Sequence, residues 1–214
     1  IHISDKGIDK VNFLDVRPLL QQNGEPYPSA KKDADHTPDP EAIRYNEATK
    51  QIFWTSEGER ILNSTTPILV NPAIRVCSPQ GQNLDSIPLP KNLSMRAIEQ
   101  GPRKNGTLEG ITFSDDFKHL YVSMEEPLYE DGLSADVTKR NTWVRFYRYD
   151  LSLKKNTAQY AYPLEPVAKP SHPVDEFKIN GVSEILWLDA TRLLTIERSF
   201  STGHLGCVVK VFIA

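Results

Sequence analysis

Cysteine is scarce in this sequence, which contains only Cys77 and Cys207 among 214 residues. The two cysteines lie 130 positions apart, and neither belongs to a spacing typical of zinc sites or redox motifs. Both lie in apolar runs typical of β-strands, so we expect two buried free thiols and not a disulfide. This scarcity argues against a thiol-based metal or redox site.

Long hydrophobic runs and a strong charge of one sign are also absent. No stretch approaches the ~20 apolar residues that span a bilayer, so we expect no membrane span in this chain. The formal net charge of -3 gives no electrostatic reason to expect nucleic acid as a partner. Residues 1–5 lack the basic start and apolar core of a signal peptide.

Several common catalytic fingerprints are missing. The sequence has no Gly-x-Ser-x-Gly nucleophile elbow, which argues against a serine esterase of the usual hydrolase form. It also lacks the glycine-rich loops that bind nucleotide phosphates or dinucleotides. The chemistry of this chain must therefore be sought in other residues.

The sequence does contain one motif that occurs three times. Each copy has a glutamate near the start of one apolar run and a second glutamate after the next run. The three pairs are Glu41 and Glu57, Glu109 and Glu125, and Glu184 and Glu197, with spacings of 16, 16 and 13 residues. An Asn-Gly dipeptide also precedes the second and third copies, at Asn105 and Asn180. This repeat predicts stacked structural units that place two carboxylates in equivalent positions.

The pattern within and after each repeat predicts strands. Apolar and polar residues alternate in short runs, which is typical of half-buried strands. Each glutamate pair spans a predicted hairpin, a third strand follows in every copy, and a fourth follows in the first two. Tandem β-sandwiches need about seven strands per unit, whereas four antiparallel strands are typical of a propeller blade. We therefore predict an all-β fold, a β-propeller of four-stranded antiparallel blades, with only part of the propeller in this chain.

The predicted domain organisation is a single β-propeller fragment over residues 1–214. Complete blades are expected at about residues 39–90 and 107–165, and an incomplete one at 179–214. Residues 1–30 are expected to be the end of an earlier blade. Because closed propellers have roughly 4–8 blades, we expect the chain to be a piece of a longer protein.

Two adjacent segments carry the most distinctive sequence, NGTLEGITFSDD at residues 105–116 and LYVSMEEPLYEDG at residues 120–132. Further distinctive segments are residues 39–43, 55–58, 145–151, 160–164, 181–189 and 192–199. Together they resemble, in order and over nearly the whole chain, the phytase-like domain family, named for the esterase-like activity of phytase. The resemblance implies an exported bacterial propeller, periplasmic or extracellular, similar in architecture to calcium-dependent phytases. It also implies hydrolysis of a small phosphate ester or carboxylic ester.

The repeated glutamates suggest a chemistry for such a protein. The first strand of a propeller blade lines the central channel, so these carboxylates are expected to form a ring near one mouth. Clustered carboxylates need cations or protons, and calcium accepts 6–8 oxygen ligands. The expected metal ligands are Glu41, Glu57, Glu109, Glu125, Glu126 and Glu197. A bound calcium would position a phosphate and an attacking water.

The remaining expected site residues act on the substrate. We expect Glu109, Glu184 and Arg198 to be the catalytic residues of this hydrolase. Arg198, Lys178 and Arg145 are expected to bind the anionic groups of the ester.

Other interpretations of the same repeat stay open. Glutamates that pair with Arg or Lys between blades would recur just as regularly without any metal. The alternative function is therefore a non-catalytic propeller that binds a ligand or partner at the bacterial cell envelope. A lactonase-type propeller, with one calcium on channel carboxylates and an asparagine such as Asn105 or Asn180, is a third possibility.

Overall fold

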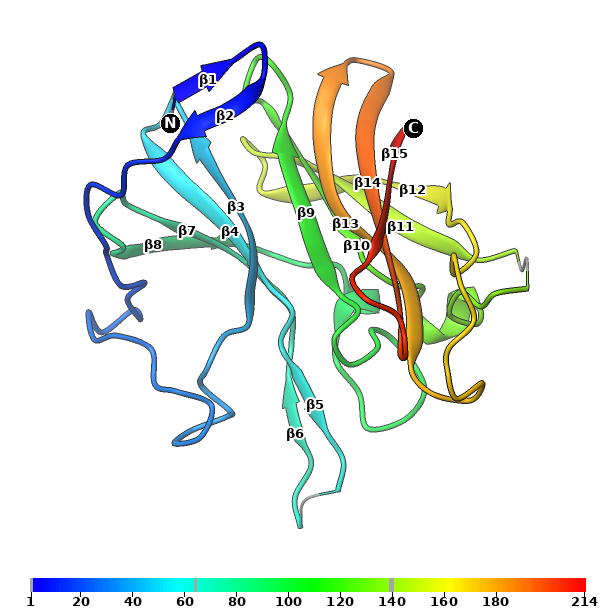
Figure 1. The fold of residues 1–214 in the computed structure, drawn as a ribbon. Coiled ribbons are helices and arrows are strands. Elements are labelled where there is room, and N and C mark those ends of the chain that lie inside the picture. Colours follow the sequence, from blue (N-terminus) through cyan, green and yellow to red (C-terminus); the bar gives the residue numbers. More distant parts are fainter. Residues whose placement is uncertain (1, 64, 139–140) are drawn as a thin grey trace.

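The computed structural model describes residues 2–63, 65–138 and 141–214 and contains several small antiparallel sheets (Figure 1). The helices of this described part are two single 3-10 turns, η1 (Lys91–Leu93) and η2 (Tyr129–Asp131). Neither is long enough to cross a membrane. The predicted all-β fold with four-stranded antiparallel sheets is confirmed.

Three sheets make up the body of the molecule (Figure 1). The first sheet contains β3 (Pro40–Asn46), β4 (Gln51–Ser56), β7 (Ala73–Cys77) and β8 (Asn83–Ile87). The second contains β9 (Leu108–Phe113), β10 (His119–Met124), β11 (Trp143–Asp150) and β12 (Lys155–Pro163). The third contains β13 (Lys178–Asp189), β14 (Arg192–Ser201) and β15 (Val208–Ile213). The first two therefore have the four strands expected of a blade, and the third has three.

Two hairpins lie outside these sheets. The pair β5 (Glu59–Ile61) and β6 (Ile68–Val70) is inserted between β4 and β7 and extends away from the first sheet (Figure 1). Sequence patterning did not predict it. Near the amino end, β1 (His2–Ser4) pairs with β2 (Gly7–Lys10). That this region ends an earlier blade stays a prediction.

The first strands of the three sheets lie side by side, with β9 between β3 and β13. Aromatic contacts join the sheets on either side of β9. The rings of Phe53 and Phe113 meet edge-on at 5.1 Å between the first and second sheets, and those of Tyr121 and Trp187 lie 5.1 Å apart between the second and third. Such pairs add to the hydrophobic gain of burying the sheet faces. The three sheets therefore pack against one another through their first strands.

The sequence repeat corresponds to a structural one, because the inner hairpin of each sheet has a register shift near its first glutamate. In the first two sheets a hydroxyl from the second strand compensates for this shift. Thr55 Oγ1 accepts the Ala42 N–H at 3.0 Å, and Ser123 Oγ accepts the Gly110 N–H at 3.0 Å. A bulge of this kind re-aims side chains, so the motif specifies where the glutamates point.

Both cysteines are free thiols, but only Cys77 is buried. The expectation of a buried thiol at Cys207 was wrong. Cys207 directly precedes β15, the last strand of the third sheet, and no described strand pairs with the outer edge of β15. An apolar run at a sheet edge gains little burial, which is why the apolar sequence around Cys207 wrongly predicted a buried thiol.

Candidate functional site

Three glutamates from the first two sheets converge in the interior. Glu57 directly follows β4, Glu109 is the second residue of β9, and Glu125 directly follows β10. Each of the three residues is at most 9% exposed, and one carboxylate oxygen from each lies within 4.8 Å of the others. We call this group the glutamate cluster.

Thr107 holds two members of the glutamate cluster in place. Its backbone N–H donates to Glu57 Oε1 at 2.7 Å, and its hydroxyl donates to the Glu57 carbonyl at 3.0 Å. Its own carbonyl accepts the Glu125 N–H at 2.7 Å. Sequence reasoning missed Thr107, although its place after the Asn-Gly dipeptide and two residues before Glu109 was an available signal.

The glycine of the Asn-Gly dipeptide makes room for a carboxylate. A β-carbon on Gly181 would lie 2.4 Å from Glu125 Cγ, and Val182 N–H donates to the Glu125 carbonyl at 3.2 Å. In the preceding copy, a β-carbon on Gly106 would lie 2.9 Å from Glu126 Oε2. The third sheet therefore packs directly on the glutamate cluster and leaves no space there for a side chain.

Burial and mutual repulsion make ionisation of the glutamate cluster costly. Burial, and then the charges of neighbouring carboxylates, together raise the pKa of Glu57 to about 7, that of Glu125 to about 8 and that of Glu109 to about 9. The Thr107 N–H opposes the shift at Glu57. Arg198, whose Nη2 lies 3.5 Å from Glu125 Oε1, opposes it at Glu109 and Glu125. One half-exposed arginine does not neutralise three buried carboxylates.

Two further acidic residues lie at the margin of the cluster. Asp39 and Glu41 are exposed, and each has an oxygen within 4.8 Å of one on Glu57. Burial, and then the charge of Asp39, raise the pKa of Glu41. The cluster therefore opens towards solvent on an acidic side.

Glu126 is buried near the cluster, and its charge raises the pKa of Glu57 and Glu125, but it is not among the carboxylates whose oxygens lie within 4.8 Å of one another. Its side chain packs on Gly106, and burial raises its pKa, opposed by a hydrogen bond from Ser134 and by the charge of Arg103. Of the six expected metal ligands, the structure thus brings together Glu57, Glu109 and Glu125, with Glu41 beside them.

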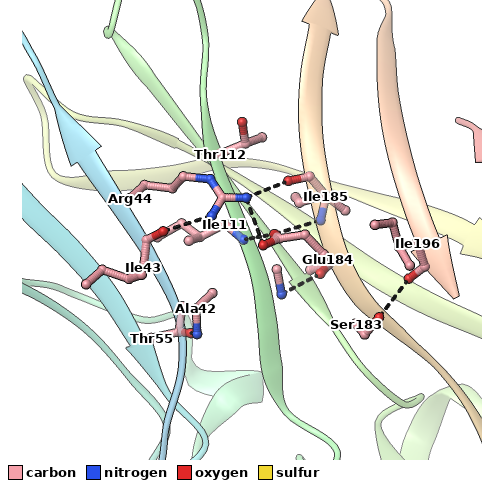
Figure 2. Close-up of polar contacts among 12 residues, drawn as sticks. Ala42, Ile43, Arg44, Thr55, Ile111, Thr112, Ser183, Glu184, Ile185 and Ile196 are labelled. Atoms are coloured by element: carbon pink, nitrogen blue, oxygen red, sulfur yellow. Dashed lines mark hydrogen bonds and ion pairs between the residues drawn. The ribbon is translucent and has the colours of Figure 1, made fainter. Parts of the chain in front are cut away.

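Glu184 forms an ion pair that connects the third sheet to the first. Its Oε2 lies 2.8 Å from Arg44 Nη2, while its Oε1 accepts backbone N–H groups of Ile185 at 2.9 Å and Ile111 at 3.3 Å. Figure 2 shows the Arg44 side chain reaching from β3 across β9 to Glu184 on β13.

The orientation of Glu184 follows from a change in the third copy of the bulge. The N–H of Ile185, at the bulge, donates a hydrogen bond to the carboxylate of Glu184 itself. In the first two sheets the equivalent backbone N–H groups donate instead to hydroxyls of the second strand. The corresponding hydroxyl, Thr195 Oγ1, is buried with no hydrogen-bond partner among the described residues. Glu184 is therefore directed at Arg44 and the backbone.

Glu197 lies in a separate polar group. It is 1% exposed, and its carboxylate accepts the Tyr162 hydroxyl at 2.7 Å and the Asn180 amide at 2.6 Å. The Glu165 N–H donates to it at 3.3 Å. These three neutral donors occupy its oxygens.

The other two expected substrate-binding residues also lie away from the cluster. Arg145 donates from Nε and Nη2 to the two Asp131 oxygens, at 2.5 and 2.6 Å, and from Nη1 to Gln159 at 2.7 Å. Lys178 begins β13 opposite Ser201, at the far end of the strand pair from Asp189. Of the expected basic residues, Arg198 is the one that the structure places beside the glutamate cluster.

The glutamate cluster fits a metal ion by the chemistry of its donors. Three buried carboxylates approach one another closely, and their ionised form needs positive charge that Arg198 supplies only in part. Oxygen ligands of this kind suit hard cations. The cluster could therefore hold a metal ion through Glu57, Glu109 and Glu125.

The comparisons with known proteins bear on the fold and on the class of chemistry. Comparison with curated proteins gives no match. Residues 1–214 match a family described as phytase-like, esterase-like activity of phytase, whose name suggests a hydrolase. Because the match covers the whole sequence, the chain belongs to the phytase-like family.

Proposed function

We propose that this protein hydrolyses phosphate esters or other esters of small molecules, with calcium held by Glu57, Glu109 and Glu125. The observation that carries the proposal is the glutamate cluster, in a chain whose family is named for an esterase-like activity. A structural role alone would not require three carboxylates to share one buried site in which, among the described residues, Arg198 is the arginine paired with a member of the cluster. Their raised pKa values show how costly that arrangement is without a cation.

Calcium is the metal that the donor set favours. All of the side-chain donors are carboxylate oxygens, and Asp39 and Glu41 lie next to Glu57 on the exposed side. Calcium accepts a large and flexible set of oxygen ligands, whereas zinc prefers nitrogen and sulfur. When bound, calcium would supply Lewis-acid polarisation of a phosphoryl or carbonyl oxygen.

The surrounding residues have separate tasks in this proposal. Arg198 is about half exposed beside Glu125, so its guanidinium can bind the anionic group of an ester at the open side of the cluster. Glu109 has the highest pKa of the three and holds a proton at neutral pH whenever the cation is absent. Glu184 acts as a positioning residue, because its contacts fix β13 against β9 and β3.

We further propose that the protein works outside the bacterial cytoplasm, in the periplasm or the medium. The support is the proposed calcium site, since calcium sites that bind in the 10⁻⁴–10⁻³ M range are typical of extracellular modules. Cell fractionation with an antibody to the natural protein tests this; recovery from the cytosolic fraction alone would contradict it.

The test of function uses the longest natural protein that contains this chain. Phosphate release from phytate, and nitrophenol release from nitrophenyl phosphate and nitrophenyl acetate, are measured with added calcium and with chelator. We expect calcium-dependent release from at least one substrate, and a loss of about 10- to 100-fold in Glu109→Gln, the range typical of a damaged metal site. Glu176→Gln, an exposed control, keeps full activity. No release from any substrate would contradict the proposal.

A non-catalytic binding function is the second candidate. It is favoured by the two repeated glutamates, Glu184 and Glu197, whose oxygens are already hydrogen-bonded within the protein. In that case the glutamate cluster binds calcium or a cationic ligand without turnover. Tight calcium binding by calorimetry, together with no release in the assays above, would support this candidate.

A further inference from the structure

Arg75, on β7, is a part-buried guanidinium that lacks the partners found for comparable arginines. Its Nε is buried with no hydrogen-bond partner, and among the described residues Arg75 makes neither an ion pair nor a hydrogen bond. A desolvated guanidinium normally finds a carboxylate, a carbonyl or an anion, since leaving it unpaired costs free energy. An anion bound beside Arg75 would supply such a partner.

The position of Arg75 is fixed by two aromatic rings. Its Cζ lies 5.9 Å from the ring centroid of Tyr27 and 5.9 Å from that of Trp54, and these two rings meet edge-on at 6.2 Å. Contact with ring faces leaves the N–H edge of a guanidinium available for in-plane hydrogen bonds. Arg75 is thus held in place with its donors unused.

Two other arginines show what a structural role looks like in the same fold. Arg60 and Arg103 both lie over the Tyr129 ring, at 5.3 and 4.3 Å. Arg60 donates to the Arg96 carbonyl at 2.8 Å, and Arg103 donates to the Gly132 carbonyl at 2.6 Å. At these two positions an arginine that stacks on an aromatic ring also donates hydrogen bonds to backbone carbonyls. Arg75 stacks on aromatic rings, but its Nε has no such hydrogen bond among the described residues.

Arg75 lines a cavity of about 210 Å³ that contains further hydrogen-bond donors. Ser56 Oγ accepts the Asp39 N–H at 3.0 Å, so its own hydrogen can be donated elsewhere. Asn71 Oδ1 accepts the Met95 N–H at 2.7 Å, which directs the Asn71 amide as a donor. A guanidinium, a hydroxyl and an amide in one cavity match the oxygens of a tetrahedral anion.

This cavity is distinct from the glutamate cluster. Along β4 and the residue after it, Trp54 and Ser56 alternate with Thr55 and Glu57, so the two sets point to opposite faces of the first sheet. The carboxylate on the rim of the cavity is Asp35, which makes no ion pair with Arg75. The proposal below therefore does not depend on ester hydrolysis or on calcium.

We propose that Arg75, Ser56 and Asn71 form a second site, which binds inorganic phosphate or the phosphate group of a monoester. The guanidinium presents its N–H edge to two oxygens of the anion, and the hydroxyl and amide donate to the others. Tyr27 and Trp54 hold the arginine in the orientation that this requires. The site supplies the partner that Arg75 otherwise lacks.

Binding of inorganic phosphate by the protein in chelator and at constant ionic strength tests this site. Calorimetry gives the affinity, and Trp54 fluorescence reports contact at Arg75. In Arg75→Met we expect affinity to fall about tenfold or more, the effect of losing a charge-assisted hydrogen bond. Arg60→Met, which removes an arginine held by an aromatic ring elsewhere, and Glu176→Gln, an exposed change, both leave phosphate affinity unchanged. Equal affinity in wild type and Arg75→Met, or no binding by wild type, overturns the proposal.

A stability measurement covers the case in which a variant is poorly folded. Phosphate should raise the urea midpoint of the wild type, because a ligand that binds the folded state stabilises it. Phosphate should leave the urea midpoint of Arg75→Met unchanged. It should raise the midpoint of Arg75→Lys by less than that of the wild type, since lysine keeps the charge but lacks the planar guanidinium. A phosphate-induced shift of the same size in all three proteins would also overturn the site.

Discussion

Gly181 lies directly against Glu125, so closely that a β-carbon at position 181 would come within 2.4 Å of Glu125 Cγ. The two residues belong to different sheets, and the contact fixes how near the third sheet comes to the glutamate cluster. The glycine of the repeated Asn-Gly dipeptide is thus needed for a close approach between sheets.

Replacing Gly181 by alanine is expected to displace Glu125 and weaken calcium binding. The added methyl group meets the middle of the Glu125 side chain, which has to move away from Glu57 and Glu109. We expect about a 10- to 100-fold loss of calcium affinity by calorimetry, as for other changes that misplace a ligand.

Gly106→Ala is the matched control, because it alters the equivalent glycine of the preceding copy. There the added methyl group meets Glu126, with Oε2 at 2.9 Å and Cβ at 3.0 Å, and since Glu126 is not a member of the glutamate cluster, calcium affinity should change much less. Equal effects of the two substitutions would show that Gly181 does not act through Glu125.

The stability of the metal-free protein is expected to fall as pH rises. Glu57, Glu125 and Glu109 have pKa values of about 7, 8 and 9 in the folded protein, against about 4.3 for glutamate in an unfolded chain. Between pH of about 4.5 and 9 the folded state therefore binds more protons than the unfolded state, so the free energy of unfolding decreases with pH. Each of the three groups, titrating by itself, would lower the free energy of unfolding on the order of 3 kcal/mol between pH 5 and 8, and the decrease is measured by urea unfolding in chelator.

Two further conditions check the origin of this pH dependence. Glu109→Gln, which is neutral at every pH, should flatten the curve. Added calcium should raise stability most at high pH, because ligands must be deprotonated to bind a metal. A stability that rises with pH in chelator would contradict the raised pKa values.

Arg44→Met is expected to destabilise the protein without changing calcium affinity. It breaks the ion pair that connects β3 to β13, in which the two side chains are 28% and 32% exposed. We expect a loss of about 1–2 kcal/mol, between an exposed ion pair and a buried one. Arg192→Met removes an exposed local pair with Asp189 and should cost less than about 1 kcal/mol. A large loss of calcium affinity in Arg44→Met would place Glu184 in the metal site after all.

Glu197→Gln is expected to lower stability and leave calcium binding intact. The substituted amide places an N–H₂ group against either the Tyr162 hydroxyl or the Asn180 amide, which both donate to Glu197. We expect a loss of about 2–4 kcal/mol in urea unfolding, typical of a broken buried hydrogen-bond group. Glu165→Gln, an exposed neighbour, should cost little. Lost calcium affinity with unchanged stability would instead make Glu197 a ligand.

Much of the local structure could be predicted from the sequence. The alternation of apolar and polar residues predicted the strands of all three sheets, and the spacing of the glutamates predicted their inner hairpins. The β5–β6 hairpin was missed, since strands of three residues give too short an alternation to recognise. The exposure of Cys207 was missed because apolarity does not reveal which strand lies at an edge.

The grouping of the glutamates could not be predicted in the same way. The sequence presents six equivalent carboxylates, yet Glu57, Glu109 and Glu125 share one site, while Glu184 and Glu197 have partners of their own. Arg44, the partner of Glu184, is 140 positions away in the chain. Contacts of that range depend on how sheets pack, and no local pattern encodes them.

By itself, the sequence determined that the chain folds into repeated antiparallel strands with a pair of glutamates on each inner hairpin, because strand alternation and hairpin spacing are local properties. The tertiary structure decided which carboxylates meet in the interior, which ones become structural, and that Arg75 Nε has no hydrogen-bond partner within the part of the chain that the structure describes. The physical reason is that burial and charge pairing depend on how the sheets pack together. That packing brings residues distant in the sequence into contact.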